Sequence, residues 1–203
     1  MPSAVDVRVA QKADVRSLSR VLGRAFFDDP VMRWMLPDDA RRARALPQMF
    51  AAMTRHHFLA GESVEVASGA GVLGAAALWD PPGRWKQTPR EELRMMPSFL
   101  LAIGRYVRRG QSVAELMKRN HPEEPHWYLA VIGSDPDVRG GGFGQALMRS
   151  RLERCDAEGA PAYLEATKES SVPYYLRFGF EVTGEITIGG GGPTMWQMWR
   201  PPG

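Results

Sequence analysis

The sequence has little of what marks several large classes of protein. It contains a single cysteine, Cys155, so it forms no internal disulfide, which fits a reducing compartment. No apolar run approaches the ~20 residues that a membrane-spanning helix needs. The first residues show no basic segment followed by an apolar one, as a secretory leader would. We therefore expect a cytoplasmic protein without a membrane partner.

Excess charge is also small. The formal net charge is +3 over 203 residues, and the basic residues are nearly all arginine, whose planar guanidinium suits phosphate and carboxylate groups. They are scattered over helix faces instead of forming one patch, so we expect no nucleic-acid partner. An anionic cofactor is sufficient reason for the slight excess. The length fits one domain spanning residues 1–203, and we expect no metal ion.

The most informative stretch joins an apolar segment to a glycine-rich turn. Residues 127–132 are short, apolar and rich in aromatic and β-branched side chains, which predicts a buried strand. Gly133 near its end predicts a bulge or a close backbone approach. Asp135-Pro136-Asp137 turns the chain, and the Arg-Gly-Gly-Gly-Phe-Gly segment at 139–144 leads into an amphipathic helix, with Arg151 on its polar side.

A strand, a glycine turn and a helix in this order favour phosphate binding. The first amides of a helix lack internal partners and carry partial positive charge. Gly140, Gly142 and Gly144 leave room for a pyrophosphate, and Arg139 adds a full charge. The spacing is neither that of a P-loop nor that of a dinucleotide-binding Rossmann turn. The alternative is a glycine-rich turn before an ordinary helix.

Two blocks resemble the GNAT N-acetyltransferase superfamily. Asp135-Pro136-x-x-Arg139-Gly140-x-Gly142-x-Gly144 resembles its motif A, which holds the pyrophosphate of acetyl-CoA, and residues 163–167 with 172–180 resemble the next strand and short helix. The resemblance implies acetyl-CoA as co-substrate. It places the acetyl-CoA contacts at Ile132, Gly133, Ser134, Arg139, Gly140, Gly141, Gly142, Phe143, Gly144, Ser171 and Tyr175.

Further segments resemble the puromycin N-acetyltransferase branch of that superfamily. Among them are Ala25-Phe26-x-Asp28-x-Pro30 and the terminal Trp196-x-Met198-x-Arg200, and the likeness is weakest over 60–120. Ser134, Gly141 and Ser171 depart from the residues usual there. Since the acceptor-covering stretch matches poorly, puromycin itself is not inferred.

The resemblance also implies catalytic roles. Tyr175 matches the tyrosine that protonates the CoA sulfur, and its phenol is an acid at neutral pH. Glu165, on a strand beside the cofactor, and Asp28, in the acceptor loop, are candidate bases. Either is alternatively a structural hydrogen-bond partner, and a water relay needs no dedicated base. Asp28 and Trp34 are the candidate contacts to the acceptor.

Together with the expected elements, the resemblance implies an α/β (α+β) GNAT fold with a mixed, mostly antiparallel sheet of about seven strands flanked by helices. We expect strands at 5–9, 63–68, 72–79, 127–132, 162–166, 180–188 and 193–199. We expect helices at 12–27, from 38 with a kink near Pro47, at 97–109, 112–120 and 172–178, and a loop at 28–36. The insertion 84–125 reads as a helical cover, with a capping box at Ser112 and Glu115. The strands at 127–132 and 162–166 should run parallel and splay, opening the cofactor cleft.

Three functions fit these observations. The favoured one transfers acetyl from acetyl-CoA to the primary amine of a small molecule. A second keeps the chemistry but acetylates a protein lysine or N-terminus. A third is an acyl-CoA-binding module without catalysis. Both a monomer and a homodimer are compatible with the sequence.

Overall fold

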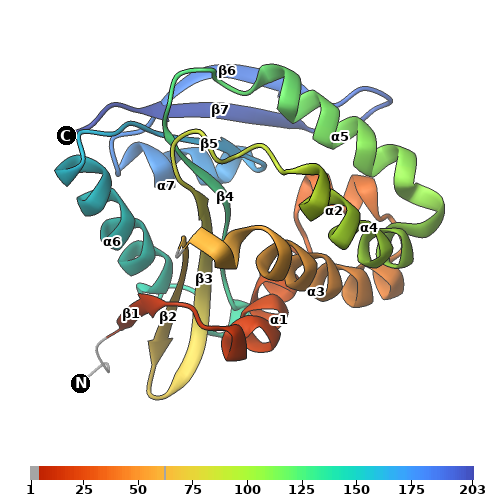
Figure 1. The fold of residues 1–203 in the computed structure, drawn as a ribbon, viewed down its shortest axis with the longest axis horizontal. Coiled ribbons are helices and arrows are strands. Elements are labelled where there is room, and N and C mark those ends of the chain that lie inside the picture. The colour runs from red at the N-terminus through yellow and green to blue at the C-terminus, as the bar shows by residue number, and fades with distance from the viewer. Residues whose placement is uncertain (1–4, 62) are drawn as a thin grey trace.

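The computed structural model describes residues 5–61 and 63–203, and all its strands belong to one sheet (Figure 1). The strands are β1 (Asp6–Val9), β2 (Val64–Gly69), β3 (Val72–Asp80), β4 (Trp127–Ser134), β5 (Ala162–Ala166), β6 (Glu181–Thr187) and β7 (Thr194–Arg200). Their spatial order is β1-β2-β3-β4-β5-β7-β6. Within the described residues β4 and β5 pair in parallel and all other neighbours pair antiparallel. The predicted mixed sheet of seven strands is confirmed.

Helices cover both faces of the sheet. They are α1 (Val15–Ala25), α2 (Pro30–Met35), α3 (Asp39–His56), α4 (Pro89–Ile103), α5 (Val107–Asn120), α6 (Phe143–Ala157) and α7 (Val172–Leu176). In Figure 1, α6 lies to one side of β2 and β3, while α1 to α5 lie on the other side. The alternating side chains of β3 show the same division: Ala76 and Leu78 join the core under α1 and α3, and Ala75, Ala77 and Trp79 join the core under α6. Both faces are therefore buried, which explains the unbroken apolar run of this strand.

The parallel pair opens after three residues. β4 pairs with β5 only from Trp127 to Leu129, and beyond Leu129 its backbone remains hydrogen-bonded to β3 alone. Ala130 is the extra residue of a bulge, because Leu78 faces Val131 while Trp79 faces Leu129. The predicted splay is confirmed, and the amides of β4 that face β5 are available to a ligand.

Gly133 marks a close approach and not a bulge. A Cβ at Gly133 would lie 2.7 Å from the Cβ of Ala25, so the end of α1 touches the strand backbone there. A second glycine, Gly23, lets α1 and α3 meet in the same way, because its Cβ would lie 2.7 Å from Cγ of Pro47. The helix around Pro47 runs on from Asp39 to His56 without interruption.

Two sequence expectations about helices were wrong. The expected loop at 28–36 contains α2, because Asp29 accepts hydrogen bonds from the amides of Val31 and Met32 and Pro30 provides the first helical residue. The expected capping box at Ser112 lies inside α5, where the Ser112 hydroxyl donates to the carbonyl of Arg109.

The capping box of this helical cover is at Thr88 and Glu91, so α4 begins at Pro89, eight residues before the helix expected from 97. Proline at the first helical position and two glutamates in the first turn strengthen this start.

Arg151 is also placed differently from expectation. It is buried, with Nε 3.4 Å from Oε2 of Glu65 on β2, and its guanidinium lies over the ring of Trp127. The buried face of α6 is therefore wider than the pattern of its apolar residues indicates. In the part of the chain that the structure describes, the helices are too short or too polar for any to cross a bilayer.

Candidate active site

A large cavity opens where β4 and β5 part. Its volume is about 1220 Å³, and it reaches from the glycine turn before α6 to the space beneath α2, α4 and α5. Most of the residues expected from the sequence line it. They are Ile132, Gly133, Ser134, Arg139, Gly140, Gly142, Phe143, Gly144, Glu165, Ser171 and Tyr175. We call the part along the glycine turn the cofactor arm and the part beneath the helices the acceptor arm.

The glycine turn leaves the N-terminus of α6 open. Gly140 and Gly142 both have φ of +82°, a left-handed conformation that favours glycine, and a Cβ on either would meet nothing within 4 Å. Gly142 is the N-cap of α6, so the first amides of the helix point into this space. Gly141 does not line the cavity. Its amide forms a hydrogen bond within the turn, to the carbonyl of Val138 at 3.1 Å. The cradle fits a pyrophosphate.

Arginines brace and charge this turn. Arg24 of α1 approaches Asp135 at 3.4 Å and Asp137 at 2.9 Å, which ties α1 to the turn. Arg139 is exposed at the rim, and its Nη2 donates to the carbonyl of Ala25 at 3.4 Å. That position leaves a guanidinium at the mouth of the cofactor arm, where it can pair with phosphate.

The two adjacent tyrosines of α7 both line the cavity. The Tyr174 hydroxyl is buried, has no hydrogen-bond partner among the described residues, and lies 3.2 Å from where a Cβ of Gly144 would be, close to Ser134. Burial raises its pKa to about 12. Burial, with Tyr174 and Asp29 adding to it, also raises the pKa of Tyr175. The position of its hydroxyl beside Gly144 places Tyr174 in the cofactor arm.

Glu165 is a buried carboxylate in the acceptor arm. Its side chain is 1% exposed, and Oε1 accepts a hydrogen bond of 3.0 Å from the Tyr163 hydroxyl. Burial raises its pKa to about 7, and hydrogen bonds from Tyr128 and Tyr163 oppose that rise. A carboxyl group with this pKa takes up and releases a proton near neutral pH, as a general base must.

Two histidines lie behind Glu165. His121, just after α5, has Nδ1 4.0 Å from Oε1 of Glu165 and Nε2 3.0 Å from Nε2 of His126. Trp85 stacks on the His121 ring at 3.8 Å, and Tyr128 meets it edge-on at 4.7 Å. Burial lowers the pKa of His121 to about 3, and it also lowers that of His126. Both imidazoles are therefore neutral at pH 7.

The two candidate acceptor contacts, Asp28 and Trp34, lie outside the cavity. Asp28 is exposed and Trp34 packs against Arg109, and neither lines the cavity. Asp29 does line it, and its Oδ2 accepts a short hydrogen bond from Thr167, the residue after β5. Burial raises the pKa of Asp29. This carboxylate is committed to holding α2 against the end of β5.

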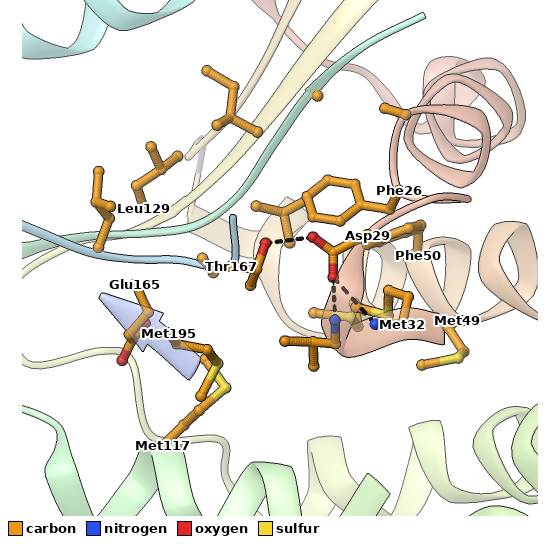
Figure 2. Close-up of a pocket in the computed structure, with 18 of the residues that line it drawn as sticks. Phe26, Asp29, Met32, Met49, Phe50, Met117, Leu129, Glu165, Thr167 and Met195 are labelled. Carbon is orange, nitrogen blue, oxygen red and sulfur yellow. Dashed lines mark hydrogen bonds between the residues drawn. The ribbon is translucent and has the colours of Figure 1, made fainter. Parts of the chain in front are cut away.

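Methionine dominates the wall of the acceptor arm. Eight of the ten methionines that the structure describes line the cavity, namely Met32, Met35, Met49, Met53, Met95, Met96, Met117 and Met195. Figure 2 shows Met117 and Met195 beside Glu165, and Met32, Met49 and Phe50 on the side of Asp29. Unbranched thioether side chains adapt to differently shaped apolar ligands. The wall therefore suits a ligand with an apolar body.

A second buried cluster of ionisable side chains lies in the cavity wall, around His57. His57, at the end of α3, has Nε2 2.9 Å from Oδ1 of Asp80 and Nδ1 3.4 Å from Oε2 of Glu91. Burial opposes a charge on His57, but the two carboxylates outweigh it and raise the pKa of the imidazole. The contacts of His57 with Asp80 and Glu91 connect α3, β3 and α4.

Four site residues were not singled out by sequence reasoning. They are Asp29, His121, and the neighbouring His126 and Tyr128, which come from three separate segments of the chain. Asp29-Pro30 offered a signal for a helix cap, whereas the histidines offered none. No group of three or more metal-ligating side chains occurs among the described residues.

Comparisons with known proteins agree on one family. The model of the acetyltransferase (GNAT) family matches residues 31–180. An uncharacterized N-acetyltransferase of Schizosaccharomyces pombe is 28% identical over 180 residues, which cover 82% of this chain and 70% of that protein. A mycothiol acetyltransferase of Streptomyces avermitilis is 29% identical over 171 residues, 81% of this chain, and the match spans about half, 54%, of the relative.

The fold has a similar solved structure. The crystal structure described as histone acetyltransferase HPA2 and related acetyltransferase from Corynebacterium glutamicum aligns with a TM-score of 0.76 and 27% identity. The alignment covers 100% of this chain and 98% of that one.

Proposed function

This chain belongs to the acetyltransferase (GNAT) family, and we propose that it moves the acetyl group of acetyl-CoA to the primary amine of a small molecule with an apolar body. The observation that carries the proposal is the position of buried Glu165 in a methionine-lined arm that joins the glycine cradle. We also propose that residues 1–203 act as one domain, which the single sheet supports.

Acetyl-CoA supplies the activated thioester, and the chain supplies positions for it. The cradle at Gly140 and Gly142 and the rim guanidinium of Arg139 fit the pyrophosphate. The unpaired edge of β4 after Leu129 offers amides to the pantetheine arm and to the carbonyl oxygen. Ser171 lines the same arm.

Two side chains handle protons. Glu165, with a pKa of about 7, takes a proton from the ammonium form of the acceptor. Tyr175 gives its phenol proton to the departing thiolate and regains a proton from the nitrogen that has formed the amide. The raised pKa of Tyr175 keeps its phenol protonated at neutral pH, so the proton is present when the thiolate leaves. For these roles the amine must enter from the acceptor arm, between the wall that contains Glu165 and the wall that contains Asp29.

The apolar, covered wall of the acceptor arm favours a small-molecule acceptor over a protein acceptor. A lysine side chain in a peptide needs an open groove for the flanking backbone, whereas α4 and α5 cover the acceptor arm here with apolar side chains such as Met95 and Met117. Puromycin is not singled out by any contact.

The test is thiol release from saturating acetyl-CoA in the presence of different amines. We expect N-acetylated product and matching thiol release with 2-phenylethylamine, and much less with spermidine or a lysine-containing peptide. Fastest turnover of the peptide would support a protein acceptor instead. Tight acetyl-CoA binding without thiol release for any amine would mean a binding module and would overturn the proposal.

A further inference from the structure

The hydrogen bonds around His121 and His126 determine which nitrogen carries each proton. Nδ1 of His126 lies 2.5 Å from the carbonyl oxygen of Glu124. A carbonyl only accepts, so Nδ1 of His126 is the protonated nitrogen. Because burial keeps His126 neutral, its Nε2 has a lone pair and accepts the proton of His121 Nε2 across 3.0 Å. The network thereby assigns both tautomers.

It follows that His121 presents a lone pair to the cavity. With its proton on Nε2, neutral His121 has an unprotonated Nδ1, and this atom lies 4.0 Å from Oε1 of Glu165. When Glu165 is ionised, two hydrogen-bond acceptors face each other in a site that is 1–2% exposed. Two such atoms repel unless a proton lies between them. A group with at least two N–H bonds satisfies both.

The rest of the site suits the same group. The rings of Trp85 and Tyr128 hold the His121 plane by stacking and edge-on contact, so the direction of the lone pair is fixed. The Tyr163 hydroxyl already donates to Glu165, and Gln197 donates to Tyr163 at 3.0 Å. This second layer orients the carboxylate without neutralising it.

We propose that the amine nitrogen of the acceptor binds between Oε1 of Glu165 and Nδ1 of His121, and that His126 makes this possible by locking the tautomer of His121. The inference rests on the proposed acetyl transfer. Glu165 takes one proton, so that R–NH₃⁺ and a carboxylate become R–NH₂ and a carboxylic acid. His121 remains neutral and holds the nitrogen through a hydrogen bond. Compounds without N–H bonds, such as quaternary ammonium ions, are not held.

The first test reads the tautomer directly by nitrogen NMR. The chain has four histidines, which makes assignment by substitution practical. We expect Nδ1 of His121 to give the signal of an unprotonated imidazole nitrogen at pH 7. We expect 2-phenylethylamine to shift this signal toward that of a hydrogen-bonded nitrogen. Trimethyl-2-phenylethylammonium, which has the same charge and no N–H, should leave it in place. A protonated Nδ1, or equal shifts with both probes, would overturn the inference.

The second test separates this role from packing. His121→Phe keeps the ring and its stacking on Trp85, and should raise the KM for 2-phenylethylamine at least 10-fold while acetyl-CoA affinity by calorimetry holds. His126→Phe should free His121 to place its proton on Nδ1 and donate it to Glu165. That change should move the ascending limb of the pH profile of kcat/KM below 7.

The titratable groups around this network are Glu165, Tyr128, Tyr163, Asp80, Lys86, Glu124 and the two histidines, and each variant replaces only one histidine.

The outcomes distinguish the two proposals. Unchanged KM in His121→Phe, or an unmoved limb in His126→Phe, would show a packing role and leave acetyl transfer standing. Absence of turnover with every amine would remove the proposed function, and the NMR result would still decide the amine site.

Discussion

The two arms of the cavity are built in opposite ways. The cofactor arm is made mostly of consecutive residues, 132–144, whose backbone we propose to bind acetyl-CoA. The acceptor arm is made of single side chains from α2 to α5 and from β3, β4, β5 and β7, which meet only in the folded chain. A binding site made from backbone depends on glycines and chain direction, so it tolerates few substitutions. A site made from side chains changes its ligand by substitution while the catalytic frame persists.

This difference decides what the sequence could predict. The turn at 139–144 was predictable because glycine spacing and helix start are local properties, and the positions of the strands along the chain followed from their apolar pattern. The acceptor arm was not, since His121 and Glu165 lie 44 positions apart (165 − 121) and meet through the packing of α5 on the sheet. The cap of α2 was also not recognised in the sequence, and its residue, Asp29, lines the cavity where the adjacent Asp28 does not.

We expect the largest effect from Tyr175→Phe, at the junction of the two arms. The change keeps the packing surface and removes the hydroxyl that should protonate the thiolate. We expect kcat to fall about 10²–10⁴-fold, with acetyl-CoA affinity retained. The measurement is steady-state kinetics with 2-phenylethylamine, together with calorimetry.

Tyr174→Phe is the partner variant. Its hydroxyl lies by Gly144 in the cofactor arm, so we expect a modest loss of acetyl-CoA affinity and little loss of kcat at saturation. A large fall in kcat from Tyr174→Phe, with a mild one from Tyr175→Phe, would exchange the two assignments.

Gly142→Val tests the cofactor arm alone. The left-handed φ of +82° disfavours valine, and its side chain would project into the open cradle. We expect acetyl-CoA affinity to fall at least about 10-fold, the equivalent of ~1.4 kcal/mol. Binding is measured by calorimetry on the folded variant.

Gly190→Val is the matched control, because Gly190 also has a left-handed φ, +69°, with nothing within 4 Å of its Cβ, and lies in the β6–β7 loop. Both variants should lose similar stability. If both also bind acetyl-CoA like the unaltered protein, the cradle is not the pyrophosphate seat.

Met117→Ala tests the acceptor arm alone, again with a matched control. Removing a half-buried methionine beside Glu165 should raise the KM for 2-phenylethylamine about 5–30-fold, since ~1–2 kcal/mol of apolar contact is lost. The KM for acetyl-CoA should not change. Leu116→Ala is the control, because Leu116 packs in the same small cluster without lining the cavity. Equal effects of both variants on the amine would point to a general loosening of α5.

The acceptor arm also depends on how its helical cover begins. The Thr88 hydroxyl accepts from the amide of Glu91 at 3.3 Å, and Glu91 accepts from the amide of Thr88 at 2.7 Å. Ser112, with the same sequence signature, lies in the interior of α5 and donates to a carbonyl of the preceding turn. A true cap satisfies amides that have no other partner, whereas an interior serine only competes with the helix.

Thr88→Ala should therefore destabilise the protein by ~1 kcal/mol, which lowers Tm by about 2–4 °C in a chain of this size. Ser112→Ala should leave Tm unchanged or raise it slightly, because alanine has the higher helix propensity. Calorimetric unfolding of both variants measures the difference, and hydrogen exchange should show faster opening at the start of α4 in Thr88→Ala only. Acetyl-CoA affinity should stay the same in both, because the cofactor arm lies outside the cover. Equal Tm values for the two variants would mean that the start of α4 is held by its packing on α3 and by the contact of Glu91 with His57, and not by its cap.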